Sequence, residues 1–317
     1  MAEILAPGWK AVREKTVILT WVITADTWPF SRLTRGCQGV GIPDIYPYDL
    51  GMKGALPSRI VCLTEETTET LYRIGESHRI VGISGFTVRP PRARKEKPRV
   101  SAFTSAKIDR ILDLNPDLVL GFSDLQADIA RELIVAGVSV MVFNHRSVEG
   151  IFDMMSTLGA LVGAPDKANI LITECAANIR DARSAKRVTA PRIDFEEWDS
   201  PQISAIRWVS ELIEIAGGID IFPELAACPD GKSRIIVDPD EVIRRAPDII
   251  IGSWCGKKFR PEKVAQRVGW DTIPAVQNGA LHEIKSADIL QPGPAALTDG
   301  LAQLQNIIKK WHQSQSK

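Results

Sequence analysis

The chain has 317 residues, with 39 basic side chains (Lys and Arg) against 39 acidic ones (Asp and Glu). Its length predicts about two domains of roughly 150 residues each, or one large α/β unit. Because 44% of the residues are hydrophobic and the net charge is zero, the composition excludes a largely disordered chain, a basic nucleic-acid binder and a polybasic membrane-surface protein.

Residues 1–56 show no sustained helical or strand period. An apolar run at 17–25 follows basic residues and has the form of a weak export signal, but it is too short to span a bilayer. Three interpretations stay open for this region. It is a degenerate export signal with a linker, an irregular native extension, or sequence upstream of a true start at Met52.

From residue 57 onward, short apolar strands alternate with helices of about ten residues. The strands are continuous apolar runs, which is typical of a parallel sheet covered on both faces. We therefore expect βαβ units. The predicted strands cover residues 59–63, 80–84, 117–121 and 138–143, the predicted helices cover residues 65–75, 106–114 and 127–136, and a basic loop covers residues 85–99.

Two helices follow, over residues 148–162 and 165–186, each with an apolar stripe of helical period. A second α/β series comes after them. Its predicted strands cover residues 192–195, 248–252 and 281–284. Its predicted helices cover residues 206–216, 240–245, 261–267 and 295–311.

An internal repeat links the two series, because residues 108–121 align without a gap with residues 239–252. In each copy an acid, Asp109 or Asp240, lies in the first turn of a helix. Pro-Asp follows seven residues later and precedes three apolar residues and a glycine. Two copies separated by a long helical connection predict two similar α/β lobes, although chance similarity remains the alternative. Ligands bind beyond the carboxyl ends of strands in open α/β sheets, so we expect a cleft between the lobes.

The loops that follow the predicted strands carry aromatic side chains. Such rings expose apolar area and need a ligand, a second lobe or another protein as partner, unless they pack locally over the strand ends. They favour a large, partly apolar ligand held by stacking and hydrogen bonds. The predicted ligand-binding residues are Phe86, Phe103, Phe122, Glu197, Trp198 and Trp254.

The sequence contains no motif of an established enzyme class. It has no phosphate loop, dinucleotide fingerprint, nucleophile elbow or paired-histidine zinc motif, and its histidines and cysteines are scattered. We therefore expect no catalytic residue, no cofactor and no metal site. An enzyme that uses the acidic run at 196–199 is the competing hypothesis, but a hydrogen-bonding loop is the favoured interpretation of that run.

Residues 57–311 resemble the class III substrate-binding proteins of ABC importers, which carry cobalamin, ferric siderophores or haem. The resemblance rests on Pro57-Ser-Arg-Ile-Val-Cys-Leu, on Arg79-Ile-Val-Gly-Ile-Ser, on both repeat copies and on the helix over 208–218 that ends in Gly-Gly. Within the family the chain looks most like the cobalamin-binding branch, in which aromatic side chains surround the corrin.

The resemblance implies two α/β lobes with parallel sheets, joined by one long connecting helix, with the ligand cleft between the lobes. The implied divisions are an N-terminal extension or degenerate signal (1–56), an N-terminal lobe (57–147), a helical connector (148–188) and a C-terminal lobe (189–312).

The resemblance also implies a monomeric, non-enzymatic protein outside the inner membrane that delivers cobalamin or a related corrinoid to an ABC permease. Asp109 and Asp240 match the positions at which the family places one permease-docking glutamate per lobe, but both are aspartates here. The alternatives are a ferric siderophore or haem as ligand, or, because the export signal is weak, a cytosolic corrinoid-binding protein with no transport role.

Overall fold

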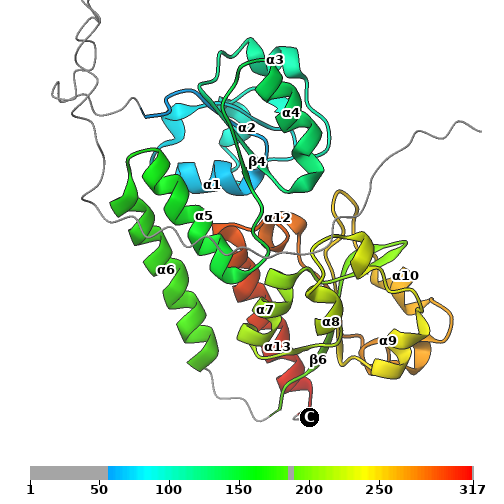
Figure 1. The fold of residues 1–317 in the computed structure, drawn as a ribbon. Helices are drawn as coiled ribbons and strands as arrows, with labels where there is room; N and C mark the ends of the chain where they lie inside the picture. Colours follow the sequence, from blue (N-terminus) through cyan, green and yellow to red (C-terminus); the bar gives the residue numbers. More distant parts are fainter. Residues whose placement is uncertain (1–55, 185–188, 316–317) are drawn as a thin grey trace, which may run out of the picture. The chain divides into compact units, whose positions relative to one another are not determined.

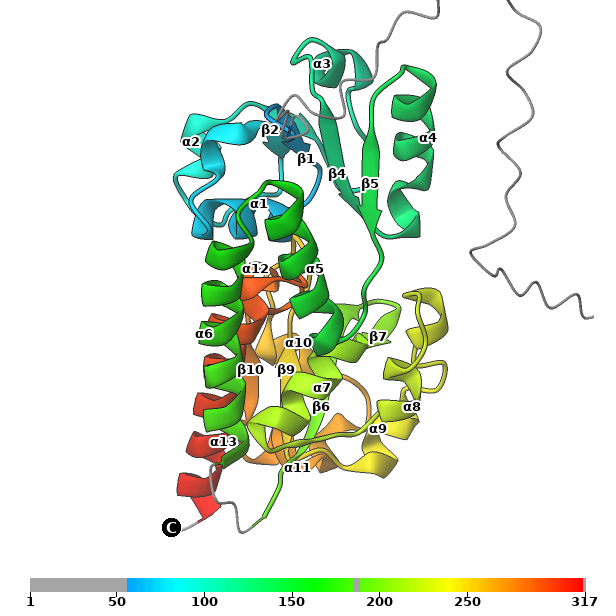
Figure 2. The same ribbon diagram turned by 60° about the vertical axis from the view of Figure 1, so that its left-hand side comes forward.

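The structure, a computed structural model, describes residues 56–184 and 189–315. These residues form two sheets of five strands each, with helices packed around them (Figures 1 and 2). The expected fold class, α/β with two lobes of mainly parallel strands, is confirmed. The expectations for residues 1–55, including a start at Met52, lie outside the described residues.

The N-terminal lobe contains a fully parallel sheet in the order β3-β2-β1-β4-β5. The residues of β1, β4 and most of β2 are buried, as their continuous apolar sequences predict. The strands are β1 (Ile60–Cys62), β2 (Ile80–Ser84), β3 (Arg99–Ser101), β4 (Leu118–Phe122) and β5 (Val140–Phe143). The helices are α1 (Glu65–Arg73), α2 (Ala93–Glu96), α3 (Ile108–Leu112) and α4 (Ala127–Val135).

Two long helices follow the first sheet, α5 (Val148–Leu161) and α6 (Pro165–Ser184). The Ser147 hydroxyl starts α5 by accepting a hydrogen bond from the backbone amide of Gly150 at 3.1 Å. Helix α5 packs on α1 of the N-terminal lobe and on α7 (Arg207–Ala216) of the C-terminal lobe, and α6 packs on α5 and α7. The helix pair therefore touches both lobes (Figure 2).

The C-terminal lobe contains a mixed sheet in the order β10-β9-β6-β7, with β8 paired to β6. Only the β6–β7 pair is antiparallel. The strands are β6 (Arg192–Asp199), β7 (Gln202–Ser204), β8 (Ile219–Asp220), β9 (Ile249–Gly252) and β10 (Leu281–Glu283). The helices after α7 are α8 (Pro223–Ala226), α9 (Asp240–Arg245), α10 (Pro261–Ala265), α11 (Pro274–Gln277), α12 (Ser286–Ile289) and α13 (Leu301–Gln315).

Two local expectations were wrong, for the loop over 85–99 and for the acidic run at 196–199, and the helix expected over 295–311 is present with a different start and end. The basic loop over 85–99 contains the short helix α2, and β3 starts at its last residue. The helix expected over 295–311 is a π-helical turn (Ala296–Gly300) followed by α13. The acidic run at 196–199, expected as a loop, belongs to β6, because this strand continues and pairs with β7 in a hairpin.

The internal repeat has the same backbone geometry in both copies. Asn115 and Ala246 occupy equivalent positions before the two Pro-Asp pairs, and both have left-handed backbones, with φ of 44° and 45°. Residues other than glycine adopt this conformation rarely, so its recurrence at equivalent positions argues against chance similarity of sequence.

The aspartate of each Pro-Asp pair holds the start of the central strand in its lobe. The Asp117 carboxylate accepts hydrogen bonds from the backbone amides of Ser58 at 2.7 Å and Arg59 at 3.0 Å. The Asp248 carboxylate likewise accepts from the Arg192 amide at 2.8 Å. The repeated sequence therefore encodes a helix–strand joint that closes onto the neighbouring strand.

Candidate ligand-binding site

The carboxyl ends of the strands in the two lobes lie near one another. The Cys255 thiol follows β9 of the C-terminal lobe. Its pKa is raised by desolvation, and the Glu197 carboxylate and the Glu65 carboxylate, which follows β1 of the N-terminal lobe, raise it further. Side chains from the start of α1, from the end of β6 and from the loop after β9 are therefore close enough to interact, as ligand binding at strand ends requires.

Two of the predicted aromatic residues in the N-terminal lobe leave ring surface exposed. Phe86 follows β2 and is 61% exposed, which is high for a phenylalanine. Phe103 is half-buried against the main core, and its carbonyl accepts a hydrogen bond from the buried amide of Gln126 at 2.9 Å. These two rings are available to a ligand that lies over the strand ends.

Phe122, the third predicted ring of this lobe, is buried. It is the last residue of β4 rather than a loop residue, and it is only 6% exposed. Its ring makes edge contacts with His145 and Trp208, at centroid distances of 5.2 and 6.4 Å. Phe122 thus contributes to the core in this structure, with the Arg146 guanidinium 4.9 Å from its ring centroid.

The C-terminal lobe places a lysine between its two predicted tryptophans. The Lys257 ammonium lies 5.5 Å from the Trp198 ring centroid and 5.3 Å from that of Trp254. Both are cation–π distances. Trp198 is half-buried and its indole N–H donates to the Ser200 carbonyl at 3.0 Å, whereas Trp254 is buried against Phe259. Trp198 is therefore the tryptophan whose ring a ligand can reach.

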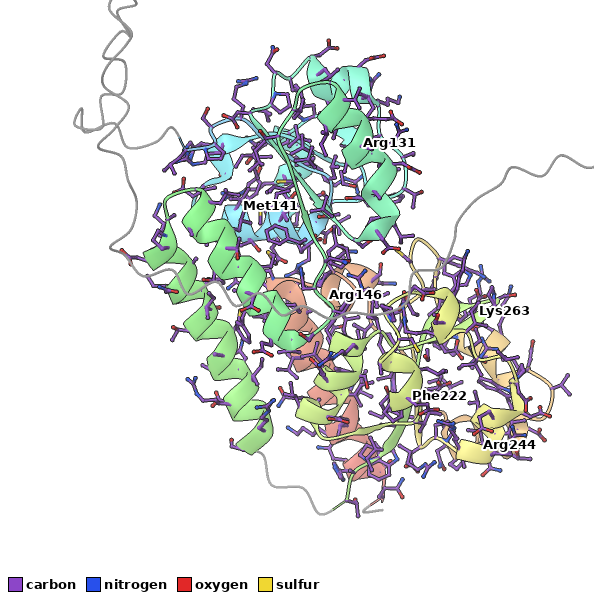
Figure 3. All side chains as sticks on the ribbon, viewed as in Figure 1. Arg131, Met141, Arg146, Phe222, Arg244 and Lys263 are labelled. Carbon is purple, nitrogen blue, oxygen red and sulfur yellow. The ribbon has the colours of Figure 1, made fainter. Side chains whose placement is uncertain are left out.

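Two arginines flank this region. Arg146 lies between the lobes in Figure 3, where it bonds the Pro229 carbonyl of the C-terminal lobe at 3.2 Å and contacts Asp124 of the N-terminal lobe at 3.5 Å. Arg234 is buried and pairs with both carboxylate oxygens of Glu197, at 2.5 and 3.2 Å. The predicted ligand residue Glu197 is therefore already held by a buried cation.

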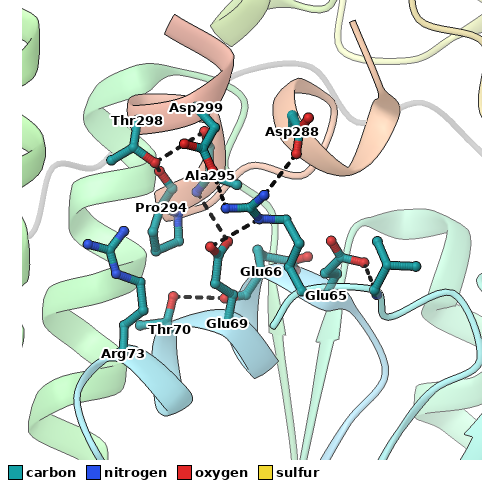
Figure 4. Close-up of polar contacts among 12 residues, drawn as sticks. Glu65, Glu66, Glu69, Thr70, Arg73, Asp288, Pro294, Ala295, Thr298 and Asp299 are labelled. Atoms are coloured by element: carbon teal, nitrogen blue, oxygen red, sulfur yellow. Dashed lines mark hydrogen bonds and ion pairs between the residues drawn. The ribbon is translucent and has the colours of Figure 1, made fainter. Parts of the chain in front are cut away.

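Buried acidic side chains on α1 form a second contact between the lobes (Figure 4). The side chains of Glu65, Glu66 and Glu69 are all buried. Glu69 accepts a hydrogen bond from the Ala295 amide at 3.1 Å. Arg89 reaches Glu69 at 3.3 Å and Asp288 at 2.9 Å, and also pairs with Asp299. This arginine therefore ties the N-terminal lobe to α12 and the π-helical turn.

Two hollows on the described surface lie outside the cluster of aromatic rings. One, of about 610 Å³, is lined by residues of α5, α6 and α7. The other, of about 760 Å³, lies in the C-terminal lobe beside the β6–β7 hairpin. The predicted docking acids are exposed in the first turns of α3 (Asp109) and α9 (Asp240), and the second hollow is lined in part by Asp240.

Sequence reasoning missed Lys257, Arg146 and Arg234, which supply the positive charge of the site. Lys257 lies in the same segment after a predicted strand as Trp254, so its position indicates a site residue as strongly as that of Trp254 does. The other two carried no such signal, because their partners are distant in sequence: 37 residues separate Arg234 from Glu197, and 83 separate Arg146 from Pro229.

Among residues 56–184 and 189–315 no cluster of three or more acidic, histidine or cysteine side chains is arranged to hold a metal ion. No helix within these ranges is long and apolar enough to cross a membrane.

A model of the periplasmic binding protein family matches residues 60–287. The chain belongs to this family. Periplasmic binding proteins of this type are non-catalytic substrate-binding proteins, so the expectation that the chain is not an enzyme is confirmed by its family.

Individual relatives of this periplasmic binding protein are distant. An uncharacterized ABC transporter substrate-binding lipoprotein of Bacillus subtilis is 22% identical over 277 residues, covering 85% of each chain. A cobalamin-binding protein of Halobacterium salinarum is 24% identical over 262 residues, covering 80% of this chain and 69% of the relative. The solved heme-binding protein of Roseiflexus sp. RS-1, in its apo form, is 22% identical with a TM-score of 0.67, covering 79% of this chain and 99% of that one. The last likeness shows the fold alone.

Proposed function

We propose that the chain binds cobalamin or a related corrinoid between its lobes, outside the inner membrane, and delivers it to the permease of an ABC importer. In this proposal the lobes are residues 57–147 and 189–312, and residues 148–188 connect them. The observation that carries it is the set of accessible rings at the strand ends of both lobes, namely Phe86, Phe103 and Trp198.

The chemistry of these loops suits a corrinoid. A corrin macrocycle presents broad apolar faces, which stack on rings, and a rim of amide groups, which hydrogen-bond to charged side chains. Lys257 and Arg146 provide donors at the edge of the ring cluster.

The test is isothermal titration of the purified chain with cyanocobalamin, in parallel with hemin and a ferric siderophore. We expect one cobalamin per chain and competition in which cobalamin displaces the other two. No cobalamin binding at tens of micromolar would overturn the proposal. Binding of hemin or the siderophore alone would leave a substrate-binding protein with a different ligand.

We further expect Trp198→Ala to weaken cobalamin binding at least tenfold, or about 1.4 kcal/mol, because a stacking face is lost. Trp311→Ala provides the matched control, since Trp311 lies on α13 and packs against the core. Its affinity should stay within twofold of the parent. Unchanged affinity in Trp198→Ala, measured by the same titration, would remove Trp198 from the site.

A further inference from the structure

Glu65 is a buried acid with one carboxylate oxygen that the fold leaves without a partner. It is the first residue of α1, just beyond the carboxyl end of β1, and it is only 3% exposed. Its Oε2 atom accepts a hydrogen bond from the backbone amide of Val88 at 2.7 Å. Its Oε1 atom is buried and has no hydrogen-bond partner among the described residues. A buried acceptor that has lost water without gaining a bond destabilises the fold, so it calls for an explanation.

The other acids of α1 show that this lack of a partner is not general. Both oxygens of Glu69 are engaged, one by Arg89 and the other by the Ala295 amide (Figure 4). Glu66 accepts from the Thr64 hydroxyl through one oxygen, and its other oxygen is buried and unpartnered like that of Glu65. A helix N-terminus favours negative charge, but it does not account for a free buried oxygen. The first two acids of α1 therefore keep acceptor capacity that the described residues do not use.

Glu65 lies next to the accessible rings of the candidate site. Val88, which donates to it, comes two residues after Phe86, whose ring is exposed. Thr87 between them is fully buried, and its hydroxyl has no partner among the described residues either. From the C-terminal lobe the exposed Cys255 comes close, because the charge of Glu65 contributes to raising the pKa of its thiol. The unused oxygen thus belongs to the region in which both lobes present strand ends.

We propose that Glu65 determines which rim the ligand carries: its free oxygen accepts an N–H from an amide of the corrinoid, and its charge rejects a corrinoid with a carboxylate at that place. The inference rests on the proposed corrinoid-binding function and adds a specificity-determining residue to it. An amide supplies the missing donor, whereas a carboxylate has no donor and carries a like charge. A site that bonds a ligand donor discriminates strongly against an analogue without it, because the acceptor of the site then stays unpaired.

The probes are cyanocobalamin and its three monocarboxylic acids, in each of which a different propionamide of the rim is hydrolysed. They are titrated into the full chain at pH 8.5, because burial raises the pKa of Glu65 to about 8 and the side chain is then mostly ionised. We expect one of the three acids to bind at least tenfold more weakly than cyanocobalamin. Equal affinity for cyanocobalamin and all three acids overturns the inference.

Glu65→Gln assigns the discrimination to this side chain. Its amide oxygen can still accept from Val88, and its amide nitrogen offers a donor to a ligand carboxylate. The disfavoured acid should therefore bind this variant within threefold of cyanocobalamin. Glu132→Gln removes the same charge at an exposed position on α4 and should discriminate as the parent does. Unchanged discrimination in Glu65→Gln overturns the inference.

The parent chain separates this inference from the proposed function. Absence of cyanocobalamin binding to the parent overturns the proposed function and the role of Glu65 with it. Cyanocobalamin binding without discrimination among the acids overturns only the role of Glu65. This comparison needs no variant, so it holds even if Glu65→Gln fails to fold.

Discussion

Arg267→Met is expected to lower the free energy of unfolding by about 3–5 kcal/mol at pH 8, because it leaves a buried carboxylate without its cation. Both nitrogens at the end of Arg267 bond the Glu196 carboxylate, which is fully buried in β6. After the substitution, Glu196 would keep the 3.2 Å hydrogen bond from the Gln202 amide. Asp194 on the same strand is also fully buried, and this burial together with the nearby Glu196 raises its pKa, although Arg267 acts in the opposite direction.

Urea denaturation of Arg267→Met, of Arg260→Met and of Arg267→Met combined with Glu196→Gln measures this effect. Arg260 is exposed, so its variant should lose less than about 0.5 kcal/mol. The double variant has no uncompensated carboxylate at position 196, so most of the lost stability should return. A double variant as unstable as Arg267→Met would show that lost packing, not the stranded charge, is responsible.

The fold was predictable from sequence wherever a local pattern determines local structure. Continuous apolar runs gave β2 its bounds, and the repeated Pro-Asp predicted the helix–strand joints that Asn115 and Ala246 now show. Where a distant side chain decides, local reasoning was wrong. Glu196 and its neighbours look like an exposed acidic loop, yet they lie in a strand because Arg267, 71 residues away, compensates the buried charge.

The site was predictable in its location but not in its accessibility. Loop aromatics were expected at strand ends, and Phe86 and Trp198 lie there with exposed ring surface. Whether a ring at such a position faces solvent depends on what the other elements pack against it. Phe122 is covered by His145 and Trp208, and Trp254 by Phe259, and neither neighbour could be assigned from spacing.

The same limit applies to α1, which reads as a surface helix with acids in its first two turns. The structure buries Glu65, Glu66 and Glu69, because α12 and the π-helical turn from the end of the chain close over them. Arg89 compensates Glu69, 20 residues away, and it also pairs with two acids about 200 residues away, Asp288 and Asp299. Sequence position indicated a helix correctly but carried no information about its burial.

The buried carboxylates predict that the free energy of unfolding falls as pH rises from about 5 to 8, and burial of His145 and His282, which lowers the pKa of both, opposes this fall only below about pH 6.5. Burial raises the pKa of Glu65 to about 8 and of Glu66 to about 7, from an ordinary value of 4.5. Between 4.5 and 8 the folded chain therefore binds more protons than the unfolded chain, and stability decreases with pH. Burial also raises the pKa of Glu69, Glu196, Asp194 and Asp220, which adds to the same trend.

Carboxylates with lowered pKa do not oppose this trend within that window. The pKa of Asp117 is lowered by hydrogen bonds from Ser58 and Arg59 against the opposing effect of partial burial, and ion pairs with Lys167 and Arg79 likewise lower that of Glu76. Such groups stabilise the fold above their unfolded pKa and lose that contribution only as pH falls through the folded value. Their effect is confined to pH below about 4.5.

Chemical denaturation of the full chain at pH 5, 6, 7 and 8 measures the trend, and Glu66→Gln assigns part of it. At pH 5 the Glu66 side chain is protonated in the folded state, so the variant should match the parent. At pH 8 folding of the parent either buries the charged Glu66 carboxylate or requires it to take up a proton, and both cost free energy. Glu66→Gln avoids this cost and should be more stable than the parent by about 2 kcal/mol. Glu132→Gln, at an exposed position on α4, should follow the parent at every pH. Two outcomes would show that these acids ionise in the folded chain without a free-energy cost. One is a parent chain that becomes more stable between pH 5 and 8, and the other is a Glu66→Gln variant whose free energy of unfolding depends on pH as steeply as that of the parent.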